Sequence, residues 1–178
     1  TLGWAEWLFQ KEVVHEAKLI AVTNKNILIR SGNSNLNEIL AKGITNYSDR
    51  GLKGLKMLFC DNMYRELMEV FLFDEFGELR DADHGTMLVQ NVENLPYNIQ
   101  ERLLQFLRTG KIPLNNGTRI SSDVRLIFST TKNLKGLVEQ GLFIEELYYR
   151  IAEHEIIIPD VQNQYVDFKR IVSSGLAY

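Results

Sequence analysis

The chain has 178 residues, of which 45% are hydrophobic, with 20 lysines and arginines against 23 aspartates and glutamates. This composition predicts one domain with a sizeable core and excludes a disordered chain. The net charge of -3 gives no overall attraction to nucleic acid, and the single cysteine, Cys60, excludes an internal disulfide framework. Because the chain has no apolar run of about 18 residues and no signal-peptide pattern, we expect a cytoplasmic protein without membrane contact.

Amphipathic segments and apolar runs alternate along the chain. The pattern predicts helices over residues 5–22, 36–44, 63–73, 98–108 and 134–149, and strands over residues 26–30, 55–59, 86–89, 124–129 and 155–158. Asn35 is expected to cap the second helix, and Gly110 to end the fourth. Strands that are almost continuously apolar and alternate with helices indicate an α/β fold with a parallel sheet covered on both faces.

Ligands of such sheets bind beyond the carboxyl ends of the strands. The first loop at this edge, SGNSNLNE over residues 31–38, lies where a phosphate-binding loop is expected. It contains only Gly32, and Asn37 stands where a lysine would reach the outer phosphates. The third strand ends in Gln90 and Asn91, which cannot supply negative charge to a metal ion or act as a general base at neutral pH.

Residues 85–159 carry a specific resemblance. They begin with GTMLVQNVENLP, continue through RLLQFLRTGKIP and VRLIFSTTKNL, and end with FIEELYYRIAEHEIIIP. This segment is similar to the central AAA+ domain of sigma-54-dependent transcription activators, the bacterial enhancer-binding proteins, which typically have GTLFLDEIGELP, LLRVLQEGEF, VRVIAATNRDL and FREDLYYRLNVFPI. The resemblance implies a three-layer AAA+ P-loop-type fold with a central parallel five-stranded sheet over residues 1–159. It also implies that residues 160–178 begin a truncated or reduced lid.

The departures from this family fall on the residues of ATP hydrolysis. The resemblance places Asn37 at the phosphate-loop lysine, Gln90 and Asn91 at the acidic pair, Thr131 at the sensor asparagine and Ile144 at the first of two arginines that reach a neighbour's nucleotide. The GAFTGA loop, which family members press against sigma-54, is missing between residues 73 and 86. We therefore expect no catalytic residue, no ATPase activity and no remodelling of sigma-54 polymerase.

The loss of the ATP-hydrolysis residues and of the sigma-54 loop resembles a biofilm regulator of this family that responds to cyclic di-GMP. A flagellar regulator of the family binds this ligand with three features: an arginine beyond the phosphate loop, a Glu-x-x-x-Arg pair, and an arginine motif before its first strand. The third feature has no clear counterpart in this sequence. Cyclic dinucleotides need cations for phosphate and flat groups for guanine. The candidate ligand residues are Arg30, Asn37, Lys42, Glu146, Tyr149 and Arg150. Arg150 could instead simply pair with Glu146, four residues earlier on a helix.

No metal site is expected, because the three histidines, His15, His84 and His154, share no ligand spacing with one another or with Cys60. The sequence thus predicts a non-hydrolysing AAA+ domain of a bacterial transcription activator that senses cyclic di-GMP and self-associates, with a dimer favoured over a ring. Promoter DNA would bind a domain outside this chain, and RNA polymerase would be a further partner. Two alternatives remain: a structural or protein-interaction scaffold without a small ligand, and an ATP-binding or slow ATPase sigma-54 activator.

Overall fold

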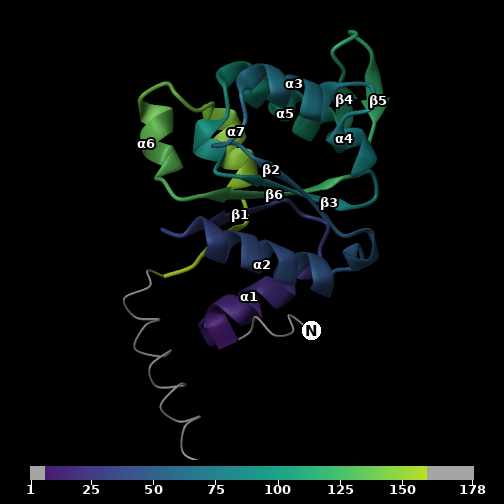
Figure 1. Ribbon diagram of the computed structural model, residues 1–178. Helices are drawn as coiled ribbons and strands as arrows, with labels where there is room; N and C mark the ends of the chain where they lie inside the picture. Colours follow the sequence, from purple (N-terminus) through teal and green to yellow (C-terminus); the bar gives the residue numbers. More distant parts are fainter. Residues whose placement is uncertain (1–6, 160–178) are drawn as a thin grey trace, which may run out of the picture.

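The computed structural model describes residues 7–159, which form an α/β domain around a five-stranded sheet (Figure 1). The strands are β1 (Ile27–Arg30), β2 (Leu55–Phe59), β3 (Thr86–Gln90), β6 (Arg125–Thr130) and β7 (Glu155–Ile157). They lie in the order β2-β3-β6-β1-β7, and every neighbouring pair is parallel. The expected parallel five-stranded sheet is confirmed.

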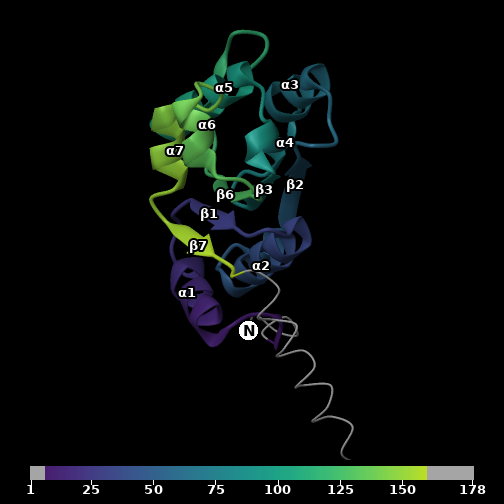
Figure 2. The ribbon, with the colours of Figure 1, turned by 90° about the vertical axis from the view of Figure 1, so that its left-hand side faces the viewer.

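Helices cover both faces of this sheet (Figures 1 and 2). One face carries α1 (Lys11–Ala21) and α2 (Ser34–Tyr47), and the other carries α3 (Arg65–Phe73), α4 (Glu78–Asp81), α5 (Tyr97–Thr109), α6 (Leu134–Glu139) and α7 (Glu145–Ile151). Short 3-10 helices, η2 (Gly51–Lys53) and η3 (Val92–Asn94), follow α2 and β3. The result is a three-layer architecture.

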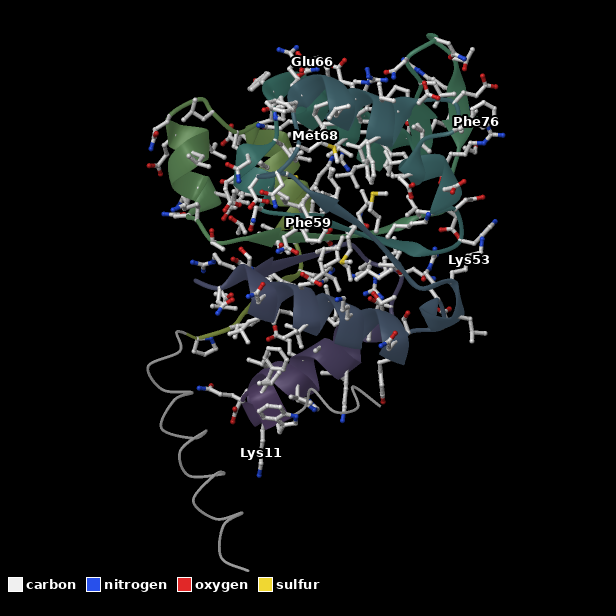
Figure 3. All side chains as sticks on the ribbon, viewed as in Figure 1. Lys11, Lys53, Phe59, Glu66, Met68 and Phe76 are labelled. Carbon is white, nitrogen blue, oxygen red and sulfur yellow. The ribbon has the colours of Figure 1, made fainter. Side chains whose placement is uncertain are left out.

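The alternation of side chains along each strand divides the core into two clusters. Ile27 and Ile29 pack against α1 and α2, whereas Leu28, between them, packs into the cluster beneath α3 to α7. Figure 3 shows Met68 pointing from α3 into this second cluster, while Phe76 lies at the surface. Both faces of each central strand are therefore buried, which explains the almost continuous apolar runs.

Three helix boundaries differ from the sequence expectation. Asn33, not Asn35, caps α2, because its side-chain oxygen accepts hydrogen bonds from the backbone N–H groups of Asn35 and Leu36. The single helix expected over residues 134–149 is wrong: α6 ends before Gly141, whose φ of 71° is a left-handed conformation that stops the helix. The helix expected from residue 5 begins at Lys11.

Two elements were not expected from the sequence. An antiparallel hairpin of β4 (Lys111–Pro113) and β5 (Arg119–Ser121) follows α5, and the short helix α4 lies between α3 and β3. Arg102 holds the hairpin, because it donates hydrogen bonds to the Asn115 side chain and the Pro113 carbonyl while its guanidinium lies 3.9 Å from the centre of the Phe73 ring. The segment after α3 is thus folded as α4, without a long projecting loop.

None of the helices within residues 7–159 is long and apolar enough to cross a membrane. The lid expected over residues 160–178 lies outside the described residues.

Arg125, at the start of β6, is a cation buried in this core. It is 2% exposed, and its guanidinium donates to the backbone carbonyls of Ile20, Ala21 and Lys25 at 2.8, 2.9 and 3.0 Å. Burial lowers the pKa of Arg125 to about 10, so the side chain remains charged at neutral pH. It therefore satisfies carbonyls at the end of α1, which the helix itself leaves unpaired, and fixes that helix to the sheet.

We expect the substitution Arg125→Met to lower the free energy of unfolding by about 3 kcal/mol, because several buried carbonyls would lose their donor. Arg119→Met, on the exposed hairpin strand β5, is the control and should change it by less than about 0.5 kcal/mol. Urea unfolding of both variants checks the prediction. Equal losses would show that the buried guanidinium contributes no more than a surface side chain.

Candidate functional site

The carboxyl ends of β3, β6 and β1 lie next to one another at one edge of the sheet. The segments that leave this edge are the loop between β1 and α2, the turn that follows β3, and the loop between β6 and α6. From the sequence we expect the degenerate phosphate loop, the amides Gln90 and Asn91, and Thr131 to lie at the ends of these strands. The fold brings them together as expected.

Asn37 is fully buried in the first turn of α2 and faces its own loop. Its Oδ1 accepts a hydrogen bond of 2.7 Å from the Ser31 hydroxyl, and its Nδ2 donates to the Thr130 carbonyl at 3.2 Å. The Ser31 N–H also donates to this carbonyl, at 3.3 Å. Asn37 therefore ties the loop to the end of β6, and a ligand cannot touch it in this conformation. Its expected role as a direct ligand residue stays a prediction, and it would require this loop to open.

Gln90 and Asn91 connect β3 to the first turn of α2. Gln90 Nε2 donates to the Ser34 carbonyl at 3.3 Å, and the Ser34 hydroxyl donates to Asn91 Oδ1 at 3.0 Å. Asn91 also adopts a left-handed backbone conformation, with φ of 58°, which asparagine tolerates better than most other residues. The two amides thus serve a local structural purpose, and neither brings a charge to the strand end.

Glu93 is a further residue of this site, and the sequence pattern does not indicate it. Its carboxylate accepts hydrogen bonds from the hydroxyls of Thr130 and Thr131, both at 2.8 Å, and from the Thr131 N–H at 3.2 Å. The donors at the end of β6 are therefore bound by a carboxylate of the same chain. The signal was a glutamate at the position where the family sequence GTLFLDEIGELP has its first glycine after the acidic pair, but its partners lie 37 and 38 residues away.

The side chains at this edge offer few groups for binding phosphate or a metal ion, or for nucleophilic chemistry. The lysine-type cation and the strand-end carboxylates are replaced by amides, and the nearby Glu93 carboxylate already accepts three hydrogen bonds from Thr130 and Thr131. Within residues 7–159 no three histidine, cysteine or acidic side chains are grouped to hold a metal ion. Burial raises the pKa of the Cys60 thiol, so this side chain is unsuited to nucleophilic chemistry.

The remaining candidate ligand residues lie apart. Arg30 ends β1 and pairs with Glu155 of β7 at 2.7 Å, while Lys42 lies on the outer side of α2 and pairs with Glu38 at 2.5 Å. Tyr149 and Arg150 lie on α7, which covers the opposite face of the sheet from α2 (Figures 1 and 2). One copy of the chain therefore does not assemble Lys42 and Arg150 into a single site.

Glu146 is the centre of an ion-pair cluster on α7. Its carboxylate accepts hydrogen bonds from Arg108 of α5, which is bonded to both oxygens, and from Arg150 at 3.0 Å. The hydrogen bonds from Arg108 and then Arg150 lower the pKa of Glu146 to about 2. Ile144, just before this helix, donates its N–H to Gln100 Oε1 at 2.9 Å and packs against the core, so its position carries no charge.

Comparison with known proteins defines the family. The profile of the Sigma-54 interaction domain matches residues 7–157. The Nif-specific regulatory protein of Rhizobium meliloti is 32% identical over 164 residues, which cover 85% of this chain and 30% of that protein. The alginate biosynthesis transcriptional regulatory protein AlgB of Pseudomonas syringae pv. tomato is 27% identical over 93% of this chain and 40% of its own length.

Solved structures agree. NtrX from Brucella abortus, in complex with ADP, superposes with a TM-score of 0.85 at 26% identity, over 91% of this chain and 38% of that chain. The P-loop NTPase domain of a sigma-54 transport activator from E. coli gives a TM-score of 0.60 at 18% identity, over 89% of this chain and 99% of that chain, which shows the shared fold alone.

The chain therefore belongs to the Sigma-54 interaction domain family and has the AAA+ P-loop NTPase fold that the sequence predicted. It spans 30% and 40% of the length of the two curated relatives named above.

The Glu146 cluster predicts a pH dependence. Since its folded-state pKa of about 2 lies below the ordinary value of 4.5, the carboxylate adds stability above pH 4.5 that is lost as the pH falls towards 2. Glu146→Gln should lower the melting temperature slightly at pH 7, and the difference from the parent protein should shrink steadily below pH 4.5. Glu101→Gln is the control, because Glu101 has no ion pair among the described residues and should show no such trend. A difference that does not change with pH would refute the ion-pair explanation.

Proposed function

We propose that this chain is a sigma-54-type AAA+ domain that does not hydrolyse ATP and acts as a sensing and self-association module of a bacterial transcription activator. The observation that carries the proposal is the buried Asn37, hydrogen-bonded to Ser31 and to the Thr130 carbonyl. A phosphate loop has to present a lysine and backbone N–H groups outwards. This loop is instead closed on its own chain.

Charge as well as geometry supports the proposed absence of hydrolysis. Phosphoryl transfer relies on a metal ion and cations that neutralise charge developing on the transferred group. Gln90 and Asn91 provide no carboxylate for the metal ion, and Glu93 is bound to Thr130 and Thr131. Ile144 cannot supply a cation to a neighbouring copy. Of the two arginines that reach a neighbour's nucleotide in the family, only the second, Arg150, remains. The phosphate-loop lysine, the acidic pair and one of these two cations are therefore missing.

The regulatory role is proposed from the relatives. The Nif-specific regulatory protein and AlgB are named as regulators, and this chain corresponds to less than half of each. We propose that promoter DNA is bound by a different part of the full protein and that RNA polymerase is its partner.

As the effector we propose cyclic di-GMP, because the combination of lost residues is most like that of the biofilm regulator VpsR. Gln90 and Asn91 themselves do not repel an anion that arrives without a metal ion, so the carboxylate of Glu93 is the negative charge that remains beside this strand end. Arg150 and Tyr149 are accessible on α7, with the Tyr149 side chain 61% exposed, and could meet phosphate and guanine. Because Lys42 and Arg150 lie on opposite faces of the sheet, a ligand that uses both would bridge two copies, and its binding would be coupled to dimer formation.

A second candidate is a protein-interaction scaffold without a small ligand. It is favoured by Tyr64, which precedes α3 as its N-cap residue, and by Leu67 and Val70 in the helix, because the three are 81%, 57% and 55% exposed at a spacing of three residues. An apolar stripe of this kind is typical of a surface that binds another protein.

Calorimetric titration with cyclic di-GMP, ATP and ADP, together with a phosphate-release assay, separates these functions. The proposal expects binding of cyclic di-GMP and no magnesium-dependent release of phosphate from ATP. No heat of binding with any of the three ligands would favour the scaffold. Turnover of ATP that is lost on substitution of Gln90 or Asn91 would establish an enzyme and refute the proposal.

The Arg150→Ala substitution tests the ligand role of α7. We expect the affinity for cyclic di-GMP to fall at least several-fold, because a charge-assisted hydrogen bond to phosphate would be lost. Arg65→Ala is a matched control, since Arg65 also forms an exposed pair four residues apart, with Glu69 at 3.8 Å. Equal affinities of the two variants would show that Arg150 does not contact the ligand and that its role is the ion pair with Glu146.

A further inference from the structure

The sheet changes its winding direction between β1 and β6. These strands are neighbours, but the chain leaves β1 towards α2 on one face and leaves β6 towards α6 and α7 on the other (Figures 1 and 2). Because the two loops separate at this point, a crevice forms outside the carboxyl ends of the strands, and ligands of open α/β sheets commonly bind there. The crevice lies further along the sheet than the amide-lined end of β3.

Two cavities occupy this crevice. One, of about 180 Å³, is lined by residues that include Arg30, Asn133, Lys135 and Tyr148. The other, of about 300 Å³, is lined by the loop after β1, the loop after β6 and the end of β7, and it includes Arg30, Asn133 and Lys132. Since Arg30 and Asn133 line both, the cavities adjoin. The larger one reaches the lower end of the range of small-molecule pockets, roughly 300–1,000 Å³.

The charge around these cavities is positive. Lys132 and Lys135 are exposed and form no ion pair with any other residue in the range 7–159. Arg30 donates its Nε–H to Glu155, the single carboxylate that lines either cavity, and its two terminal amino groups have no hydrogen-bond partner among the described atoms. Several unused cationic donors therefore converge on one opening.

Glu93 and Asn37 would prevent an anion bound in this crevice from extending to the end of β3. The carboxylate of Glu93 already accepts the Thr131 N–H and hydroxyl hydrogen bonds, and its negative charge would repel a second anion beside it. Asn37 fills the space inside the loop that follows β1. The positive crevice is thus open while the neighbouring part of the edge is closed.

We infer that this crevice binds a phosphate-bearing anion without a metal ion, with Arg30, Lys132 and Lys135 as the phosphate contacts. Guanidinium and ammonium groups bind phosphate oxygens by charge-assisted hydrogen bonds. Tyr148, half-buried in the wall of the smaller cavity, offers a flat surface to a ring attached to the phosphate. The inference rests on the proposed function in one respect: it places one phosphate of the anionic effector on Arg30, Lys132 and Lys135, while the rest of the ligand remains available to Arg150 and Tyr149 of a second copy.

The test is calorimetric titration of the protein with inorganic pyrophosphate and, separately, with cyclic di-GMP. The double variant Lys132→Ala with Lys135→Ala should weaken the binding of each ligand by roughly tenfold or more, because two charged contacts are removed. The matched control is Lys25→Ala with Lys111→Ala, which removes the same charge from exposed positions before β1 and in β4. The control should stay within about twofold of the parent protein, since only long-range attraction changes.

The outcomes separate the pocket from the identity of the effector. Loss of pyrophosphate binding in the double variant, with no binding of cyclic di-GMP by any form, would support the anion site and overturn cyclic di-GMP as the effector. Binding of cyclic di-GMP that is equal in the double variant and the control would overturn this site and leave the proposed function intact. No binding of either ligand by the parent protein would overturn the inference. Circular dichroism spectra of both variants establish that they are folded.

Discussion

The hydrogen bonds of the buried Asn37 side chain constrain the whole functional edge of this domain. A buried amide is costly unless both its oxygen and its nitrogen are paired, and here Ser31 and the Thr130 carbonyl provide the partners. A lysine at the same place would bring a charge that needs an anion beside it, so a phosphate loop stays open to its ligand. The neutral amide removes that need, and the loop can close on the end of β6 without any bound molecule.

Charge is distributed unevenly along the edge beside this closed loop. The carboxylate nearest to β3 is that of Glu93, and it is used to hold Thr130 and Thr131 within the same chain. Positive charge lies on the other side of β6, where Arg30, Lys132 and Lys135 surround the crevice at the change in winding direction. An edge that uses a metal ion to join a carboxylate pair to phosphate needs both charges at one point. In this protein the amides of Asn37, Gln90 and Asn91 stand at that point and bring no charge to it.

The architecture could be predicted from the sequence because the apolar and amphipathic patterns that indicate it are local and recur along the chain. Five apolar runs alternating with amphipathic segments predict a covered parallel sheet, and the approximate positions of all five strands were correct. The hairpin was missed because its strands have three residues each, too short for a periodic signal. The cap of α2 was placed two residues too late because Asn33 and Asn35 are chemically alike, and only the backbone conformation separates them. Glu93 was missed because its partners on β6 are distant in the sequence and are brought near only by strand pairing.

The Glu146 cluster bears on whether Arg150 is merely structural. In an isolated pair, movement of the arginine to a ligand would leave the carboxylate without its partner, and the lost pairing would offset part of the gain. Here Glu146 is also bound by Arg108 through both of its oxygens, so it keeps a cation when Arg150 moves. Arg108 reaches Glu146 from α5, a different helix, and its hydrogen bond is the largest cause of the lowered pKa of Glu146. Arg150 is therefore the less committed of the two arginines, and among the side chains of this cluster it is the one best placed to bind an anion presented by a second copy of the chain.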